Sequence, residues 1–303
     1  MPALTTHAHL SPLDHGEVMA LATRVLEVDG VFPLNEEATL GPAHATHVLA
    51  RDGADLVGYG VRMPDSSAQI LVDPSHRRRG VGWSILCQIG LDASVWAFGN
   101  LECAQSFCTS RGLAPVRELL VMETSVTESD SRRPRPATPT RPPADPAITI
   151  SAYRPDDLID LVELNARAFA SHPDQGRLGV GDFQARMASP WFDPAGLLIA
   201  RDAAGAMAGF HWTKMEGRDA EVYVLGVDPG HGGAGIGRLL LTAGVDHLRA
   251  HGATVIRLWV EGDNVRAKSL YEASGFSVVR RDLQYRKVDT ATAVFEADRG
   301  RQE

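Results

Sequence analysis

A glycine-dense segment that follows an apolar run is the first candidate for chemistry in this sequence. Residues 222–238 read VYVLGVDPGHGGAGIGR, which predicts a strand, a loop and a helix that begins near Ile236. Such a loop exposes several backbone N–H groups at a helix N-terminus, and these bind phosphate. The segment lacks the Lys-Ser or Lys-Thr of a Walker loop, and its glycine spacing is not that of a dinucleotide-binding fingerprint. We therefore predict a phosphate site of another kind.

The same pattern occurs earlier in the chain. Val72-Asp73-Pro74 matches Val227-Asp228-Pro229, and Gly80-Val81-Gly82 matches Gly235-Ile236-Gly237 at one constant offset. Matches in this register, with the same order of elements around them, indicate an internal duplication.

The two loops differ in charge. The first contains Arg77-Arg78-Arg79, whereas the second has Gly232 in place of Arg77, so its backbone amides remain but the side-chain cation is missing. His231 and Arg238 are candidates to replace that cation. The basic first loop could also be a surface turn that caps a helix.

The elements that position these loops follow one order in both halves. In the first half the patterns predict a helix over 14–28, strands over 47–50, 55–61 and 69–72, a helix from the loop to residue 91, a helix over 100–112 and a strand over 116–122. In the second they predict a helix over 158–169, strands over 197–200, 207–213 and 221–227, a helix from the loop to residue 251, a strand over 255–260, a helix over 264–274 and a last strand over 276–286. We therefore predict two domains, 1–126 and 146–303, joined by an extended linker over the Pro- and Arg-rich residues 127–145.

Composition limits the class of function. The net charge of −8 does not favour a nucleic-acid partner, and no apolar run is long enough to span a membrane. The chain has no signal-peptide core, and its three cysteines lack metal-ligand spacing, so we expect a cytoplasmic protein without a metal cofactor. We also expect a monomer.

The motifs resemble those of the GNAT N-acetyltransferases. Residues 77–82 fit the family's Arg/Gln-x-x-Gly-x-Gly/Ala loop, and Asn264-x-x-Ala267-x-x-x-Tyr271-x-x-x-Gly275-Phe276 matches its C-terminal signature. The resemblance implies an α/β (α+β) fold of two tandem GNAT domains, each a mixed central sheet flanked by helices, with acetyl-CoA as co-substrate.

The resemblance also implies roles for three residues. Tyr271 would protonate the leaving CoA thiolate, and a bulge in the central strand would leave the amide of Leu225 to polarise the thioester carbonyl. Glu221, at the start of that strand, would accept the proton of the attacking amine, although a carboxylate at a strand end is also commonly just solvated. The first half lacks counterparts of Glu221 and Tyr271, so we expect the second half to be catalytic.

Within this family, the chain resembles the mycothiol synthases, tandem-GNAT enzymes of actinobacteria, over nearly its whole length. The most specific segments are Gly209-Phe210-His211-Trp212-Thr213-Lys214 and Glu221-Val222-Tyr223-Val224. That family acetylates the cysteinyl amine of desacetylmycothiol, a thiol made of cysteine, glucosamine and inositol. The resemblance implies substrate contacts at Glu36, Asp174, Lys214, Glu221 and Trp259. In the second half it implies acetyl-CoA contacts at Leu225, Gly226, Val227, Gly232, Gly233, Ala234, Gly235, Ile236, Gly237, Arg238, Asn264, Val265, Arg266, Ala267, Lys268 and Ser269. In the first half they fall on Ile70, Leu71, Val72, Arg78, Arg79, Gly80, Val81, Gly82 and Trp83.

These observations lead us to expect transfer of an acetyl group from acetyl-CoA to desacetylmycothiol, with Glu36 of the first half contributing to the acceptor site. Two alternatives remain open. The chain could be a tandem GNAT for another amine, such as an aminoglycoside, a polyamine or a protein N-terminus, or an acyl-CoA-binding module without turnover.

Overall fold

The structure is a computed structural model that describes residues 2–40, 44–125, 148–170 and 175–287. The chain forms two compact units. One consists of the described residues of Met1–Leu120, Glu261–Asp263 and Arg280–Glu303, and the other of those of Val121–Val260 and Asn264–Val279. The predicted linker over 127–145 lies outside the described residues.

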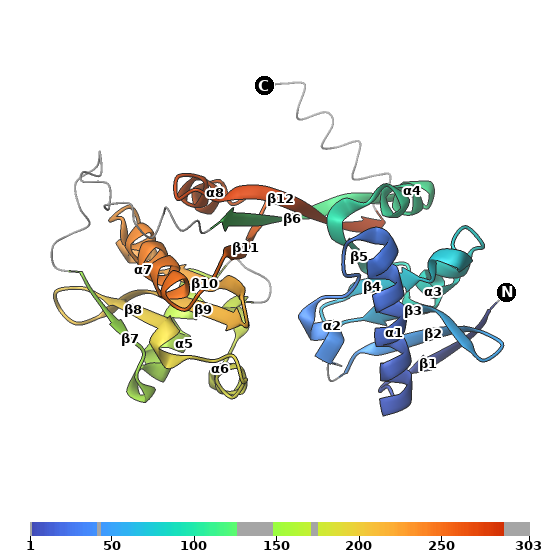
Figure 1. Cartoon of the computed structure of the whole chain (residues 1–303), viewed down its shortest axis with the longest axis horizontal. Coiled ribbons are helices and arrows are strands. Elements are labelled where there is room, and N and C mark those ends of the chain that lie inside the picture. Colours follow the sequence, from blue (N-terminus) through green and yellow to red (C-terminus); the bar gives the residue numbers. More distant parts are fainter. Residues whose placement is uncertain (1, 41–43, 126–147, 171–174, 288–303) are drawn as a thin grey trace, which may run out of the picture. The chain divides into compact units, whose positions relative to one another are not determined.

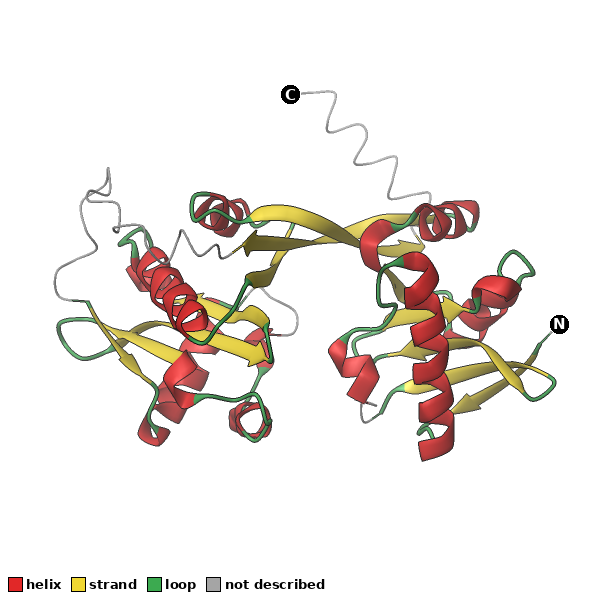
Figure 2. Ribbon diagram, in the orientation of Figure 1, coloured by secondary structure: helices red, strands yellow, loops and turns green. Residues whose placement is uncertain are grey.

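The elements predicted for the first sequence half appear in Figures 1 and 2 in the expected order, and the structure adds β1, α2 and β5. Their bounds are β1 Ala3–His7, α1 Pro12–Asp29, α2 Glu36–Leu40, β2 Thr46–Asp52, β3 Asp55–Arg62, β4 Ser67–Val72, α3 Val81–Ile89, β5 Ser94–Ala97, α4 Glu102–Ser110 and β6 Leu113–Ser125. The first unit has the strand order β1-β2-β3-β4-β5-β12, in which β12 spans Ser277–Lys287. Only β4 and β5 among these neighbours run parallel, so the sheet is mixed.

The second half repeats this arrangement. Its elements are β7 Thr149–Ala152, α5 Leu158–Ala168, α6 Val180–Met187, β8 Leu197–Arg201, β9 Met207–Glu216, β10 Asp219–Val227, α7 Ile236–Ala250, β11 Val255–Glu261, α8 Val265–Glu272 and β12 Ser277–Lys287. The strand order is β7-β8-β9-β10-β11, and β10 and β11 form its parallel pair.

The last strand departs from a division into sequential halves. In β12, Leu283–Tyr285 pair antiparallel with Val95–Ala97 of β5, and the described residues from Arg280 to Lys287 group with the first unit. The chain thus returns to complete the sheet of the first unit after it has built the second.

Helices cover both faces of the second unit's sheet because its strands alternate between two apolar clusters. Leu197 and Ile199 of β8 pack with α5, α6 and β9 on one face. Leu198 and Ala200 face the other way, toward Ile236 and Leu240 of α7. The first unit has the same layers, with α1 over one face and α3 over the other.

The central strand β10 contains the bulge that the resemblance implied. The register against β9 shifts between Val222 and Val224, and the neighbouring residues Tyr223 and Val224 both pack into the cluster under α5. Leu225 and Val227 face α7. A bulge is needed to put two consecutive side chains on one face, and it reorients the strand beyond it.

None of the helices in the described ranges has the length and apolar character needed to cross a membrane.

Candidate active site

A pocket in the second unit lies where β9, β10 and β11 are adjacent. Its lining combines two cationic side chains, three carboxylates and one indole, and consists of Lys214, Glu216, Asp219, Ala220, Glu221, Val255, Arg257 and Trp259. Three of the five predicted acceptor contacts, Lys214, Glu221 and Trp259, therefore lie together.

Strand register explains this grouping. Glu221 is paired with Lys214 of β9 on one side and with Arg257 of β11 on the other. Side chains of directly paired residues project from the same face of a sheet, so the carboxylate lies between two cations. On β11, Trp259 is two residues from Arg257 and shares its face.

Lys214 is unusually buried for a lysine, with 8% of its surface exposed. Its Nζ lies 3.2 Å from Glu216 Oε2 and 5.1 Å from the centre of the Trp191 ring. Ion pairing and a cation–π contact offset part of the cost of desolvating this ammonium. The lysine is therefore held at the pocket wall.

The prediction from sequence missed Arg257, Glu216 and Asp219. Arg257 is fixed by Glu123, with 2.7 Å between Nε and Oε1. The period of two from Trp259 back to Arg257 on a predicted strand could have identified the arginine. The two carboxylates flank the turn between β9 and β10, where Asp219 pairs with Glu216, and their place depends on the hairpin register.

The parallel pairing of β10 with β11 covers only the first part of β10. It joins Asp219–Glu221 to Val255–Arg257, whereas the antiparallel pairing with β9 continues through Val227. Leu225, Gly226 and Val227 thus lie on the segment of β10 that follows both the bulge and the end of this register.

The glycine loop begins beyond Val227 with a fixed turn. Asp228 accepts a hydrogen bond from the Gly230 amide at 2.8 Å and one from Arg167 Nε at 2.9 Å. Burial raises the pKa of Asp228, but these two donors together hold it below its ordinary value. Gly233 and Gly235 adopt φ values of 86° and 81°, which favour glycine. Helix α7 then begins with no side-chain cap at Gly235, which leaves its first amides to a ligand.

One guanidinium lies close to the loop position at which the side-chain cation is missing. A Cβ atom added to Gly232 would lie 3.4 Å from Nη1 and 3.6 Å from Nη2 of Arg266, which follows the N-cap of α8. His231, one of the two residues considered from sequence, is instead directed to Asp202, with 3.3 Å between Nε2 and Oδ2. Arg238 is exposed in the first turn of α7. Arg266 is therefore the guanidinium beside the place where the family's side chain would start.

In the C-terminal signature over 264–276, Asn264 caps a helix and Tyr271 is buried. Asn264 caps α8 by accepting a hydrogen bond from the Ala267 amide at 3.0 Å. Tyr271 is buried on α8, and its ring packs against Phe276 at 5.9 Å between centroids. Burial raises the pKa of Tyr271 to about 12, so its hydroxyl keeps its proton at neutral pH. Tyr271 does not line the pocket around Glu221.

The first-unit loop has the same scaffold. Asp73 accepts hydrogen bonds from the Ser75 amide at 3.0 Å and Arg24 Nε at 2.9 Å, as Asp228 does from its own turn and Arg167. Burial raises the pKa of Asp73, but these donors, with the Ser75 hydroxyl, bring it to about 2. Arg77, the family's loop arginine, instead forms a two-pronged ion pair with Asp29 at 2.8 and 2.7 Å.

Of the two other predicted acceptor residues, Glu36 opens α2 in the first unit. Asp174 is outside the residues that the structure describes. The predicted CoA contacts of the first half lie on the end of β4 and on the loop and first turn of α3.

Comparisons with known proteins agree with this architecture. Residues 160–276 match the acetyltransferase (GNAT) family model. The chain is 42% identical to a mycothiol acetyltransferase of Clavibacter sepedonicus, with 92% of this chain and 95% of that protein aligned. It is 41% identical to one of Propionibacterium freudenreichii, with 97% and 94% aligned.

Solved structures resemble the whole chain. A GCN5-related N-acetyltransferase from Sphaerobacter thermophilus has a TM-score of 0.68 at 21% identity, with 93% of this chain and 94% of that chain covered. A tandem GNAT protein from the clavulanic acid biosynthesis pathway has a TM-score of 0.67 at 18% identity, with 93% and 98% covered. These two establish the tandem GNAT fold.

Proposed function

This chain belongs to the mycothiol acetyltransferases, a family of GNAT N-acetyltransferases, and we propose that it transfers acetyl from acetyl-CoA to the cysteinyl amine of desacetylmycothiol. Enzymes of the GNAT family take their acetyl group from acetyl-CoA. The proposal concerns the acceptor, the residues that hold both substrates and the side chains that move protons.

Acetyl-CoA fits the second-unit loop. Its pyrophosphate would accept hydrogen bonds from the uncapped amides at the start of α7, where the helix dipole also favours negative charge. Arg266 would supply the charge-assisted contact that Gly232 cannot. Leu225, Gly226 and Val227 would bind the part of acetyl-CoA that carries the thioester.

The pocket around Glu221 carries the acceptor proposal. Desacetylmycothiol bears an ammonium and many hydroxyl groups, and the lining offers three carboxylates, two cations and the Trp259 indole N–H. Opposed charges on adjacent strands suit a ligand that donates and accepts hydrogen bonds at once.

We assign the proton transfers and the stabilisation of the carbonyl oxygen to three groups. Glu221 would take a proton from the acceptor amine, so that the nitrogen lone pair can attack the thioester carbonyl. The backbone N–H of Leu225 would donate a hydrogen bond to the carbonyl oxygen as it gains negative charge. Tyr271, kept neutral by burial, would donate its proton to the departing sulfur.

The test is the Glu221→Gln variant, with Asp219→Asn as a matched control in the same pocket. We expect kcat for desacetylmycothiol to fall by about 10²–10⁴-fold in Glu221→Gln, with acetyl-CoA binding unchanged, because only the proton acceptor is lost. The control should retain most of its turnover. Release of CoA thiol is the readout, and unchanged turnover in Glu221→Gln would reject the assignment of the base.

The same assay separates the other functions. A preference for an aminoglycoside, a polyamine or a peptide N-terminus over desacetylmycothiol would replace the proposed acceptor. Binding of acetyl-CoA without thiol release for any of these amines would indicate a non-catalytic module.

A further inference from the structure

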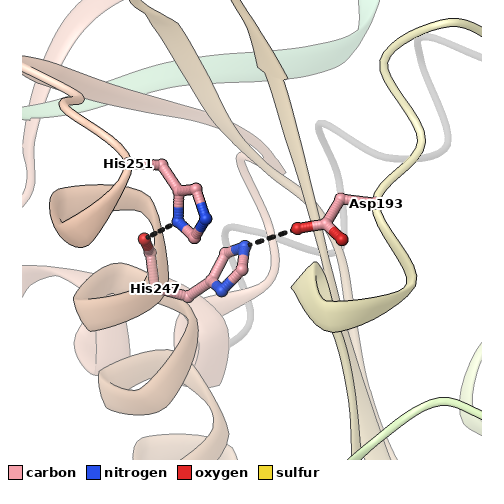
Figure 3. Close-up of side chains that lie close together, drawn as sticks. All are labelled: Asp193, His247 and His251. Atoms are coloured by element: carbon pink, nitrogen blue, oxygen red, sulfur yellow. Dashed lines mark hydrogen bonds and ion pairs between the residues drawn. The ribbon is translucent and has the colours of Figure 1, made fainter.

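Three side chains with metal-ligating atoms converge at the C-terminal end of α7, and none of them belongs to the proposed acetyl-transfer residues. Asp193, His247 and His251 each offer one ligand atom, and these atoms all lie within 4.8 Å of one another. Figure 3 shows the two imidazoles and the carboxylate turned toward a common point. The histidines are one helical turn apart, so they project from the same side of α7.

Two of these side chains, Asp193 and His251, are oriented by hydrogen bonds to backbone groups. One oxygen of Asp193, Oδ1, accepts the amide hydrogen bond of Ala195 at 2.9 Å and thereby begins the short 3-10 helix Pro194–Gly196. The Nδ1 atom of His251 lies 2.8 Å from the His247 carbonyl oxygen, to which it can only donate. These bonds leave Asp193 Oδ2 and His251 Nε2 as the atoms available to an ion. In metal sites, ligand side chains are commonly oriented in this way, by a hydrogen bond at the atom that does not bind the metal.

The third side chain, that of His247, lies at a distance from Asp193 that suits two ligands of one ion. Nε2 of His247 lies 3.1 Å from Oδ2 of Asp193. In a tetrahedral zinc site with bonds of about 2.0–2.1 Å, ligand atoms are about 3.3 Å apart. The His247 ring also packs closely against Gly196, where a Cβ atom would lie 3.0 Å from Nε2.

We propose that Asp193, His247 and His251 bind a divalent transition-metal ion of the zinc type, with water completing its coordination. Two imidazoles and one carboxylate are ligands that zinc accepts. This differs from our expectation from sequence, which considered cysteine spacing and foresaw no metal.

The site is structural in this proposal. From the start of α7 to His247 the helix rises about 17 Å at 1.5 Å per residue, so the ion would be remote from the glycine loop. It would fasten the segment before β8 to the last turn of α7.

The experiment uses the full chain after treatment with a chelator. Zinc binding is measured by calorimetry, and Co²⁺ serves as a spectroscopic probe of tetrahedral coordination. We expect one zinc ion per chain and a higher Tm on its addition. Loss of an outer hydrogen bond typically weakens metal affinity 10–100-fold, so removal of a ligand in His251→Gln should weaken it by about 100-fold or more.

Two further variants complete the test. Asp193→Asn keeps an oxygen for the Ala195 amide but removes the ligand charge, and it should also weaken zinc binding. His9→Gln changes an exposed histidine of the first unit and should bind zinc as the parent chain does. Absence of zinc binding in the parent chain, or equal affinity in His251→Gln, would overturn the proposal; acetyl transfer is measured alongside and should not respond to the chelator.

Discussion

Replacement of Arg266 by alanine tests whether this guanidinium takes over the role of the loop side chain absent at Gly232. Both of its terminal nitrogens lie within 3.6 Å of the place where a Cβ atom on Gly232 would be. A hydrogen bond to a charged group contributes about 1.5–3 kcal/mol, and the exposed setting of Arg266 favours the lower figure. A loss of about 1.5 kcal/mol corresponds to roughly a tenfold change in affinity.

We therefore expect Arg266→Ala to raise KM for acetyl-CoA about tenfold while kcat stays near its original value, since the contact is made equally before and during reaction. The assay is initial-rate release of CoA thiol with acetyl-CoA varied. It is repeated at about 0.01 M and 0.1 M salt, where the Debye length falls from about 30 to 10 Å and the effect should shrink. Arg286→Ala, an exposed arginine on β12, is the charge-matched control.

A second substitution sharpens the test. Gly232 has φ −60° and ψ 134°, which any residue can adopt, so Gly232→Gln places the family's side chain without backbone strain. Added to Arg266→Ala, it should recover part of the lost affinity, because the Arg266 guanidinium no longer occupies the space beside residue 232. The Pro229 carbonyl oxygen, 3.2 Å from the new Cβ atom, then has to shift by only a few tenths of an ångström. An unchanged KM in Arg266→Ala at low salt, or a double variant no better than the single one, would refute the compensation.

Three other outcomes follow from buried groups in the second unit. Tyr271→Phe should lower kcat by about 10²-fold at unchanged KM, and because burial raises the pKa of Tyr271 to about 12, its ionisation should cause no loss of kcat in a pH profile up to about pH 10. Gly244→Ala should lower the free energy of unfolding by about 1–3 kcal/mol in denaturant titrations, since its Cβ would lie 2.1 Å from the His211 ring. Burial lowers the pKa of His211 from 6.5 to about 4, so the unfolded chain binds more protons between these values and stability should fall by up to about 3 kcal/mol as pH drops through that range. A smaller fall in His211→Gln would support the last prediction, and an identical one would contradict it.

Elements with a clear periodic pattern or a motif were predictable from the sequence, whereas several short elements without one were missed. The helix predicted over 158–169 is α5, Leu158–Ala168, because its apolar residues recur at helical spacing. Strand β5, Ser94–Ala97, has only four residues, too few to show a period. Helix α6 was also missed, because Phe183 is its one fully buried side chain and gives no repeat.

The site could be predicted only in part, since most of its geometry depends on register. Glu221 stood out by its place before the glycine loop, and Lys214 and Trp259 came from the resemblance to a family. These three side chains come together only because particular residues of β9 and β11 pair with Glu221. The register between two strands cannot be read from the sequence of either strand alone. Arg257 is Glu221's direct partner on β11. Its spacing of two from Trp259 could have placed it on the same face, but only the strand register shows that it is opposite Glu221.

The two glycine loops show why agreement with a motif does not by itself identify a working site. The first loop matches the family pattern at every position. Its key arginine, Arg77, however, donates hydrogen bonds from both terminal nitrogens to Asp29 and so connects the loop to α1. The second departs from the pattern at Gly232, yet a guanidinium from another element, that of Arg266, lies beside the gap. Each aspartate that shapes its turn, Asp73 or Asp228, is conserved between the copies as a structural device. The charge that a phosphate needs is therefore better sought among spatial neighbours of the loop than at the motif position, and the orthodox copy has the weaker claim to catalysis.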